Sequence, residues 1–140
     1  MTGTTVLRLI TNFGDAGLTI PLAAGCALWL STTDKREAWM WIGSLAGALA
    51  LVGVNKILYA GCSIEIRSID FRVISGHTML TSAVWGVTLG LLAGSRGAGW
   101  YRLGAASGLA LGALIGVCRV VQDAHTPIEV VAGWFLGGGI

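Results

Sequence analysis

Four stretches of the chain lack charged residues and consist mainly of apolar side chains. They cover residues 16–33, 38–55, 78–95 and 103–118. Each is close to the roughly 17–25 residues that an α-helix needs to cross the hydrocarbon core of a bilayer. A fifth uncharged run, 130–140, is shorter, so the last helix either begins before this run or is truncated in this chain. The pattern predicts an all-α fold, a polytopic transmembrane helical bundle of about five helices.

The composition supports the same interpretation. Hydrophobic residues make up 54% of the chain and charged residues only 11%, which excludes an ordinary soluble protein. A length of 140 residues predicts a single membrane-embedded domain over 1–140. The 22 glycines gather in the apolar runs, as in GAASGLALGALIG at 104–116, and small residues let membrane helices approach closely. The chain does not start with basic residues followed by an apolar core, so we expect the first helix to be retained as a span.

The charges gather on one side of this predicted bundle. If the helices cross alternately, the junction between the second and third spans and the junction between the fourth and fifth lie on one membrane face, here called the active face. Ionisable groups in membrane proteins are costly, so a cluster of them indicates a functional site. Both histidines of the chain belong to the cluster. The ionisable residues expected there are Lys56, Glu65, Arg67, Asp70, Arg72, His77, Arg119, Asp123, His125 and Glu129.

His125 and Glu129 form the first candidate pair. They are four residues apart at the start of the predicted last helix, so they would share a helix face. A carboxylate in this position can accept the Nδ1–H of the imidazole and fix its tautomer. The pairing makes Nε2 a better nucleophile or base.

The other candidate residues suit an anion. Arg119 supplies a forked guanidinium, and Lys56 adds a second cation at the end of the second predicted helix. Ser75 and Gly76 offer a hydroxyl and backbone amides at the start of the third helix, where the helix dipole favours an anion. His77 beside them could protonate a leaving oxygen. Together these groups are the parts that phosphoryl transfer requires.

Each of these residues also has a plainer interpretation. Lys56 or Arg119 alone is commonly a snorkelling anchor at a helix end, and a single interfacial histidine is commonly a satisfied polar residue. Two histidines and a carboxylate would also suit zinc. However, the histidines lack a tight paired spacing, and the neighbouring cations would repel a metal ion. The joint pattern therefore favours an anion site with no metal and no cofactor.

Two segments resemble the second and third signatures of the phosphatidic acid phosphatase type 2 superfamily, PSGH and SRxxxxxHxxxD. They are SGH at 75–77 and CRVVQDAHTPIE at 118–129, and both the spacing and the order along the chain match. The resemblance covers roughly residue 56 to the C-terminus. It implies a metal-independent phosphoric monoester or diphosphate hydrolase that acts on membrane lipid phosphates through a phosphohistidine intermediate.

By position in these signatures, the resemblance implies a role for each candidate residue. His125 would be the nucleophile, Glu129 its orienting carboxylate and His77 the general acid. The phosphate-binding residues implied in the same way are Lys56, Ser75, Gly76 and Arg119. Three positions depart from the signatures: Ile74 replaces proline, Cys118 replaces serine, and Glu129 replaces aspartate.

The first signature of that family, KxxxxxxRP, is only partly present. Seven residues after Lys56 the chain has Ser63 in place of arginine, and no proline follows. Arg67 or Arg72 in the next loop could supply the missing cation, although their spacing does not indicate it. Solvated loop charge is the other interpretation of these two arginines. The segment IDFRVISGH is similar to a bacterial branch with LDF..FSGH-like sequences, which suggests that a weak first signature can be tolerated.

The expected partners are a membrane lipid phosphate and the bilayer, with no nucleic acid, and the oligomeric state is left open. Substrates implied by the resemblance are phosphatidic acid, phosphatidylglycerol phosphate, undecaprenyl diphosphate and lipid A phosphates, and no residue chooses among them. The alternative function is a catalytically inactive membrane protein that binds phospholipid headgroups. Binding requires only the cations, whereas catalysis also requires His77, His125 and Glu129.

The orientation follows from the basic residues outside the predicted site. The active face carries Arg8, Arg67 and Arg72, and the opposite face carries Lys35, Arg36, Arg96 and Arg102. This excess favours the opposite face as cytoplasmic. We therefore expect an active site that faces the periplasm from a bacterial inner membrane.

Overall fold

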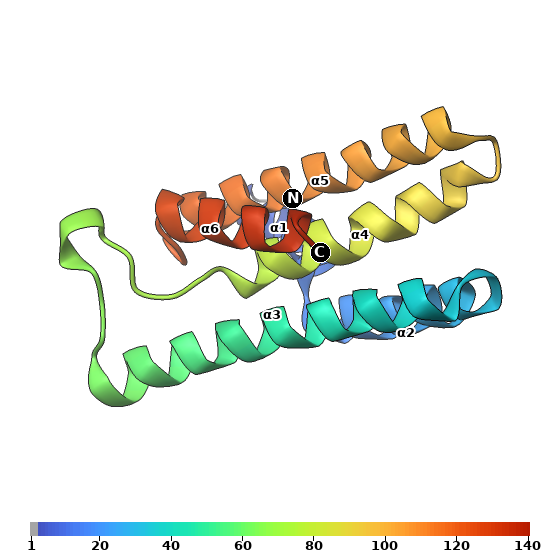
Figure 1. Cartoon of the computed structure of the whole chain (residues 1–140). Helices are drawn as coiled ribbons and strands as arrows, with labels where there is room; N and C mark the ends of the chain where they lie inside the picture. Colours follow the sequence, from blue (N-terminus) through green and yellow to red (C-terminus); the bar gives the residue numbers. More distant parts are fainter. Residues whose placement is uncertain (1–2) are drawn as a thin grey trace.

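The computed structural model describes residues 3–140, and these are almost entirely helical (Figure 1). The helices are α1 (Gly3–Thr11), α2 (Ala16–Thr33), α3 (Lys35–Cys62), α4 (Gly76–Gly94), α5 (Ala98–Val121) and α6 (Pro127–Gly138), with 3-10 turns η1 (Asn12–Gly14) and η2 (Arg67–Ile69). The predicted all-α fold is confirmed, and α2 to α6 correspond to the five predicted helices. The short helix α1 was not predicted, because Arg8 interrupts its apolar pattern.

Several helices extend past their uncharged runs. Asp34 caps α3 by accepting hydrogen bonds from two backbone amides of its first turn. The helix continues to Cys62, so Lys56 lies within it and not at its end as predicted. Helix α6 begins at Pro127, where the missing amide of proline has little cost. The last helix therefore begins before its uncharged run, which was the first of the two explanations for the shortness of that run.

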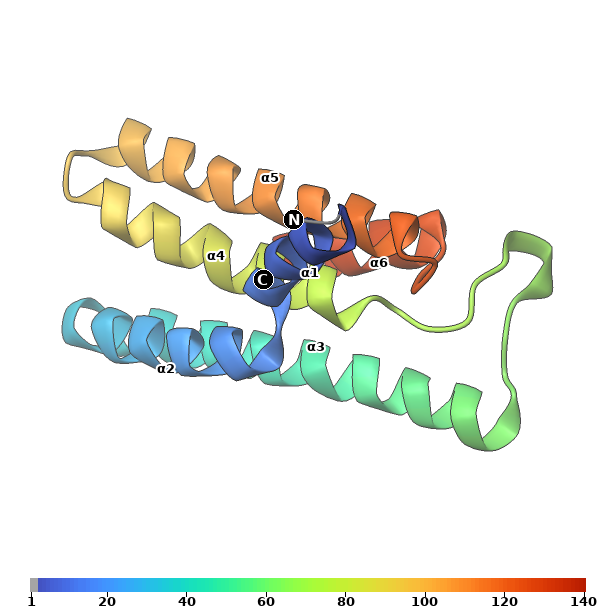
Figure 2. The same cartoon turned by 180° about the vertical axis from the view of Figure 1, so that it is seen from behind.

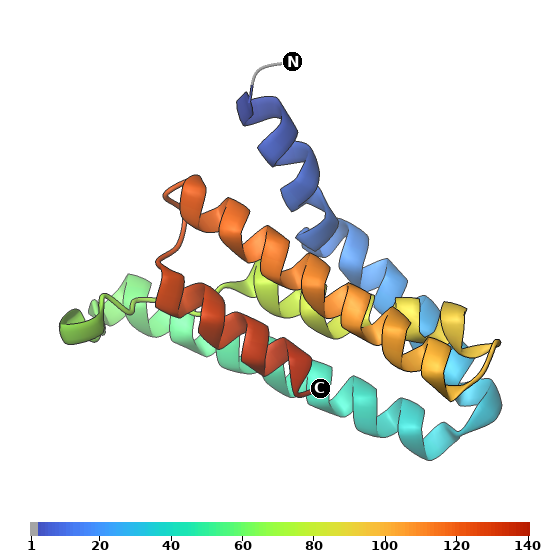
Figure 3. The same cartoon turned by 90° about the horizontal axis from the view of Figure 1, so that it is seen from above.

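Helix α4 is the centre of the bundle and packs against α2, α5 and α6 (Figures 1 and 3). Its buried residues include several with hydroxyl groups. Thr81, Ser82 and Thr88 each donate a hydrogen bond to the backbone carbonyl one turn earlier in the same helix. These polar groups are therefore satisfied inside the protein.

Glycines set the distance between α4 and its two neighbours. A Cβ on Gly104 or Gly108 of α5 would collide with the backbone of α4. A Cβ on Gly133 or Gly137 of α6 would collide with backbone carbonyl oxygens at the N-terminal end of α4. The prediction of tight helix packing is confirmed. The contacts from α6 hold the N-terminal end of α4, where the candidate site begins.

Three helical stretches within residues 3–140 are long and apolar enough to cross a membrane, namely Thr5–Thr33, Lys35–Cys62 and Ala98–Val121. They indicate that the chain associates with a membrane. Helix α4 is not among them, although the run 78–95 was predicted to span. It has only 19 residues and carries His77 in its first turn, and its neighbours in the bundle enclose it.

Both connections that carry the predicted site lie at the same end of the bundle. In Figure 1 the α3–α4 loop and the α5–α6 turn are on the left, and the α2–α3 and α4–α5 turns are on the right. Figure 2 shows the same division from behind. Helix α1 projects from the bundle at an angle (Figure 3). The structure therefore brings the two halves of the predicted active face together.

Candidate active site

Glu129, on the first turn of α6, is the buried centre of the candidate site. Its side chain is only 1% exposed. One carboxylate oxygen, Oε1, accepts hydrogen bonds from the backbone N–H groups of Arg72 at 2.8 Å and Val73 at 3.1 Å. The other, Oε2, accepts from the N–H of Thr126 at 3.1 Å. Three donors favour the ionised carboxylate, which fastens the α3–α4 loop to the start of α6.

His125 contacts the same carboxylate. Its Nδ1 lies 2.8 Å from Oε2 of Glu129. An ionised carboxylate only accepts hydrogen bonds, so Nδ1 carries the proton and Nε2 keeps its lone pair. The structure thus pairs the two residues, but not along a helix face as predicted. His125 precedes the N-cap residue Thr126, and the pair meets across the N-terminus of α6.

The surroundings of His125 favour its neutral form. Burial lowers the pKa of the imidazole below its ordinary value of 6.5, while the hydrogen bond to Glu129 opposes this shift. The positive charges of Arg119 and Lys56 lower the pKa further. Neutral imidazole is the state in which Nε2 is nucleophilic.

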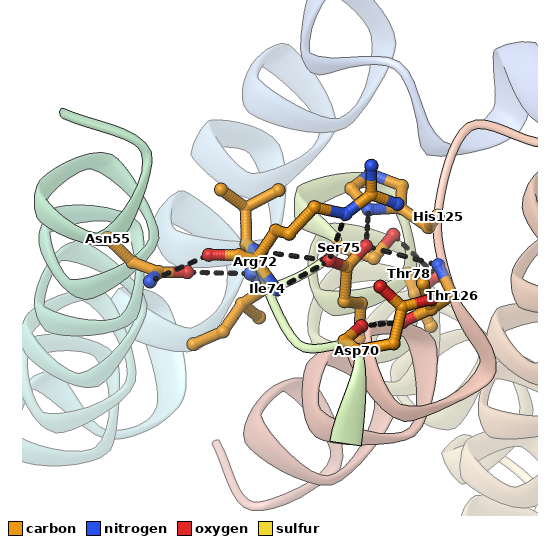
Figure 4. A network of polar contacts seen from close by, with 10 residues as sticks. Asn55, Asp70, Arg72, Ile74, Ser75, Thr78, His125 and Thr126 are labelled. Atoms are coloured by element: carbon orange, nitrogen blue, oxygen red, sulfur yellow. Dashed lines mark hydrogen bonds and ion pairs between the residues drawn. The ribbon is translucent and has the colours of Figure 1, made fainter. Parts of the chain in front are cut away.

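The α3–α4 loop is also held from its other side, by α3. Asn55 Oδ1 accepts a hydrogen bond from the N–H of Ile74 at 2.7 Å, and its Nδ2 donates to the carbonyl of Arg72 at 3.4 Å. Thr126 Oγ1 donates to the carbonyl of Asp70 at 2.9 Å (Figure 4). Sequence reasoning missed Asn55 and Thr126. One feature of the sequence could have pointed to Asn55: it is a polar amide in an otherwise apolar helix, one residue before Lys56, the lysine predicted to bind phosphate.

Lys56 reaches the start of α4. Its Nζ lies 3.8 Å from the position that a Cβ on Gly76 would occupy. Gly76 is the first residue of α4, and the first N–H groups of a helix have no acceptor within that helix. A cation beside such amides forms a favourable environment for an anion.

Arg119 supplies a second cation from the last turn of α5. Its Nη1 donates to Oε1 of Gln122 at 3.3 Å. Its Nε is buried and has no hydrogen-bond partner among the residues described. A buried donor without a partner is costly, and an oxygen of a bound anion would remove that cost.

Ser75 is placed differently from the prediction that its hydroxyl faces the anion. The residue is fully buried, and its Oγ lies 3.0 Å from Oγ1 of Thr78. Its backbone N–H donates to the carbonyl of Glu129 at 3.1 Å. Both polar groups of Ser75 therefore already have partners that help to fix the start of α4.

His77 lies on the first turn of α4, and its side chain is 34% exposed. Its Nε2 is 4.0 Å from Oδ2 of Asp15, the residue that caps α2. The segment before Asp15 is attached to α4, because Nε1 of Trp85 donates to the carbonyl of Phe13 at 2.8 Å. No sequence pattern predicts that Asp15 approaches His77, because a contact between α2 and α4 is set by packing.

The two loop arginines occupy different environments. Arg67 is 89% exposed and bonds to Glu65 at 2.7 Å, away from the paired histidine. Arg72 lies in the cluster, with its Nε 3.5 Å from Oε1 of Glu129. The negative charge of Glu129 raises the pKa of Arg72, which keeps the guanidinium charged. Of the two, Arg72 is the better candidate for the cation missing from the first signature.

The assembled site suits nucleophilic attack on an anionic centre. It combines an oriented neutral imidazole, a second histidine, and the cations Lys56, Arg72 and Arg119. Within residues 3–140, no group of three or more His, Cys, Asp or Glu side chains is arranged to hold a metal ion. Such a set of groups can stabilise the charge that develops during phosphoryl transfer.

Comparisons with known proteins agree with this chemistry. The family model of the PAP2 superfamily matches residues 62–140. A Klebsiella pneumoniae protein described as "Uncharacterized 22.5 kDa protein in cps region" is 34% identical over 132 residues. The alignment covers 93% of this chain but only 63% of that protein, so the chain spans less than two thirds of its relative's length. No solved structure matches the chain significantly. The match over α4 to α6, together with the two signatures, shows that the chain belongs to the PAP2 superfamily, whose members are generally phosphatases.

Proposed function

We propose that the chain is an integral membrane, metal-independent phosphatase that hydrolyses lipid phosphates or diphosphates through a phosphohistidine intermediate. In this proposal residues 1–140 act as one membrane-embedded domain. The observation that carries it is the 2.8 Å contact between Nδ1 of His125 and Oε2 of Glu129, made beside a cluster of cations. This contact leaves Nε2 of a neutral imidazole as the only nucleophilic atom of the ring.

In the first step, Nε2 of His125 attacks phosphorus, and the bond from phosphorus to the leaving oxygen breaks in line. Lys56, Arg119 and the first amides of α4 at Gly76 hold the non-bridging oxygens and stabilise their developing charge. His77 donates a proton to the leaving oxygen. Ser75 contributes by orienting the start of α4, and Arg72 adds a further positive charge.

In the second step, water attacks the phosphohistidine. His77, now neutral, takes a proton from that water, and the bond between phosphorus and Nε2 breaks. Inorganic phosphate leaves, and Nε2 regains its lone pair. Glu129 keeps the imidazole in one tautomer throughout.

The proposed substrate is a membrane lipid whose phosphate enters the polar end of the bundle while its tail remains in the bilayer. The long apolar helices support this assignment, because they would hold the site at the membrane interface. The excess of basic residues at the opposite end supports a site facing the periplasm of a bacterial inner membrane. The proposal requires no metal, cofactor or nucleic acid.

The test is phosphate release by the detergent-purified protein from a panel of lipid phosphates and diphosphates, with EDTA present. We expect wild type to release phosphate and His125→Ala to lose on the order of 10³-fold or more in kcat, because the nucleophile is removed. Arg96→Gln, at the far end of the bundle, is the matched control and should behave as wild type. Radiolabelled substrate should leave an acid-labile label on wild type and none on His125→Ala.

Four results would contradict this proposal. Release from no substrate, or equal release by His125→Ala, would exclude catalysis through His125. If the protein bound lipid phosphates without turnover, the headgroup-binding alternative would replace the phosphatase. Loss of activity in EDTA would indicate a metal-dependent reaction.

A further inference from the structure

A cleft of about 510 Å³ opens between the N-terminal segment and the active-site ends of α4 and α5. His77 and Arg119 lie on one wall. The opposite wall is formed by Leu7, Arg8, Thr11 and Asn12. The cleft volume is in the range of small-molecule sites in proteins. The N-terminal wall lies outside the region that the family model matches, so it is not part of the signatures.

The part of the N-terminal wall that belongs to α1 turns its two polar residues, Arg8 and Thr11, toward the cleft together with Leu7. Arg8 and Thr11 line the cleft, whereas Val6 and Leu9 are exposed on other sides of α1. The junction after α1 is firmly packed, because a Cβ on Gly14 would lie 2.6 Å from Oγ1 of Thr81 and 3.0 Å from the carbonyl oxygen of His77.

The charged side chains that line the cleft, Arg8 and Arg119, are both positive, and the nearby Asp15 approaches His77 instead, with Oδ2 4.0 Å from its Nε2. Among residues 3–140, no acidic side chain forms an ion pair with Arg8. The buried Nε of Arg119, on the other wall, also has no hydrogen-bond partner among those residues. No carboxylate is among the residues that line the cleft. Two guanidinium groups around one concave site favour an anionic occupant.

The position of the cleft indicates which part of a substrate it would receive. In the proposed reaction His77 protonates the leaving oxygen, so the leaving group lies on the side of His77, and the cleft continues from there to Arg8. We infer that Arg8 binds a second phosphate, attached through the leaving oxygen, and makes the site prefer diphosphates to monophosphates. In this reaction the bridging P–O bond breaks, the bridging oxygen takes the proton of His77, and a lipid monophosphate leaves. This inference rests on the proposed function.

The kinetic test compares farnesyl diphosphate with farnesyl monophosphate, which have the same tail and differ by one phosphate. In Arg8→Gln, the ratio of kcat/KM for the diphosphate to kcat/KM for the monophosphate should fall about 10- to 100-fold, as expected for one charge-assisted hydrogen bond. Arg8→Lys should recover part of the ratio, because it keeps the charge and loses the fork. Arg96→Gln should keep the wild-type ratio.

A binding test separates this inference from catalysis. Methylenediphosphonate and methylphosphonate cannot be hydrolysed at the corresponding bonds, and their affinities are measured by calorimetric titration of wild type and Arg8→Gln. We expect Arg8→Gln to weaken methylenediphosphonate binding about 10-fold more than methylphosphonate binding. Equal weakening of both, no weakening, or no binding of either would overturn the inference. If wild type showed this selective binding but hydrolysed no substrate, the proposed function would fail while the role of Arg8 stood.

Discussion

Glu129 connects the chemistry of the site to its shape. It occupies the position where the signature SRxxxxxHxxxD has aspartate. Its carboxylate accepts hydrogen bonds from three backbone N–H groups and also contacts Nδ1 of His125. An aspartate at the same backbone position would be shorter by one methylene and would not reach all of these donors without movement of the loop. The α3–α4 loop of this chain is thus adjusted to the longer acid.

The fall of kcat/KM on the acidic side of its pH profile should reflect the protonation of His125. Attack requires neutral imidazole, and kcat/KM falls as pH drops through the pKa of His125 in the free enzyme. Burial lowers that pKa, so the fall should occur below the ordinary value of 6.5. Glu129 opposes the effect of burial, so Glu129→Gln should shift the fall to still lower pH. It should also lower kcat by on the order of 10²- to 10⁴-fold, because the tautomer is no longer fixed.

The measurement is kcat/KM from about pH 4 to about pH 9 for wild type and Glu129→Gln. Thermal unfolding at each pH separates loss of activity from loss of structure. An acidic fall centred above 6.5 in wild type, or a shift to higher pH in the variant, would contradict the assignment of His125 as the neutral nucleophile.

The position of the site depends on how closely α4 can approach α5 and α6. Gly108 of α5 leaves no room for a Cβ, because the backbone of α4 at Trp85 and Gly86 lies directly against it. Gly47 of α3 is a natural control, since a Cβ there would meet nothing within 4 Å. Both glycines lie in long apolar helices, but Gly108 is packed against another backbone whereas Gly47 has open space around it.

Gly108→Ala should destabilise the protein by about 1–3 kcal/mol, because the added methyl group forces α4 and α5 apart. Gly47→Ala should stabilise it by about 0.5–1 kcal/mol, since alanine loses less backbone freedom in a helix than glycine does. Both changes are measured as the midpoint of thermal unfolding in detergent. Equal shifts in the two variants would contradict the packing role of the α4–α5 glycines.

Across the whole bundle, the uncharged runs predict the helices and their order well. They also predict which connecting loops lie at the same end of the bundle, because helices that cross the membrane alternately place the α3–α4 and α5–α6 connections on one side. The runs do not predict α1, which carries Arg8, and they place Lys56 at a helix end because the second uncharged run stops at residue 55. Helix boundaries depend on capping and packing, which do not follow from the absence of charge.

The candidate site was predictable only where the spacing of residues determines contact. His125 and Glu129 are close in sequence, and a short spacing constrains their distance. By contrast, Asn55 contacts the loop at Ile74, and Asp15 approaches His77, only through the packing of separate helices. The inward direction of Ser75 likewise depends on Thr78 and the surrounding bundle. Such contacts require the folded structure.

The orientation of the whole molecule can be tested with its own cysteines. Cys62 is exposed at the end of α3 on the active-site side, whereas Cys26 and Cys118 are buried. If that side faces the cell exterior, a membrane-impermeant maleimide should label Cys62 in intact spheroplasts, and Cys62→Ser should remove the label. In the Cys62→Ser background, Ser95→Cys places a thiol at the opposite end of the bundle, and it should be labelled only after permeabilisation. The reverse pattern would put the site on the cytoplasmic side and would show that the small excess of basic residues at the opposite end does not determine orientation.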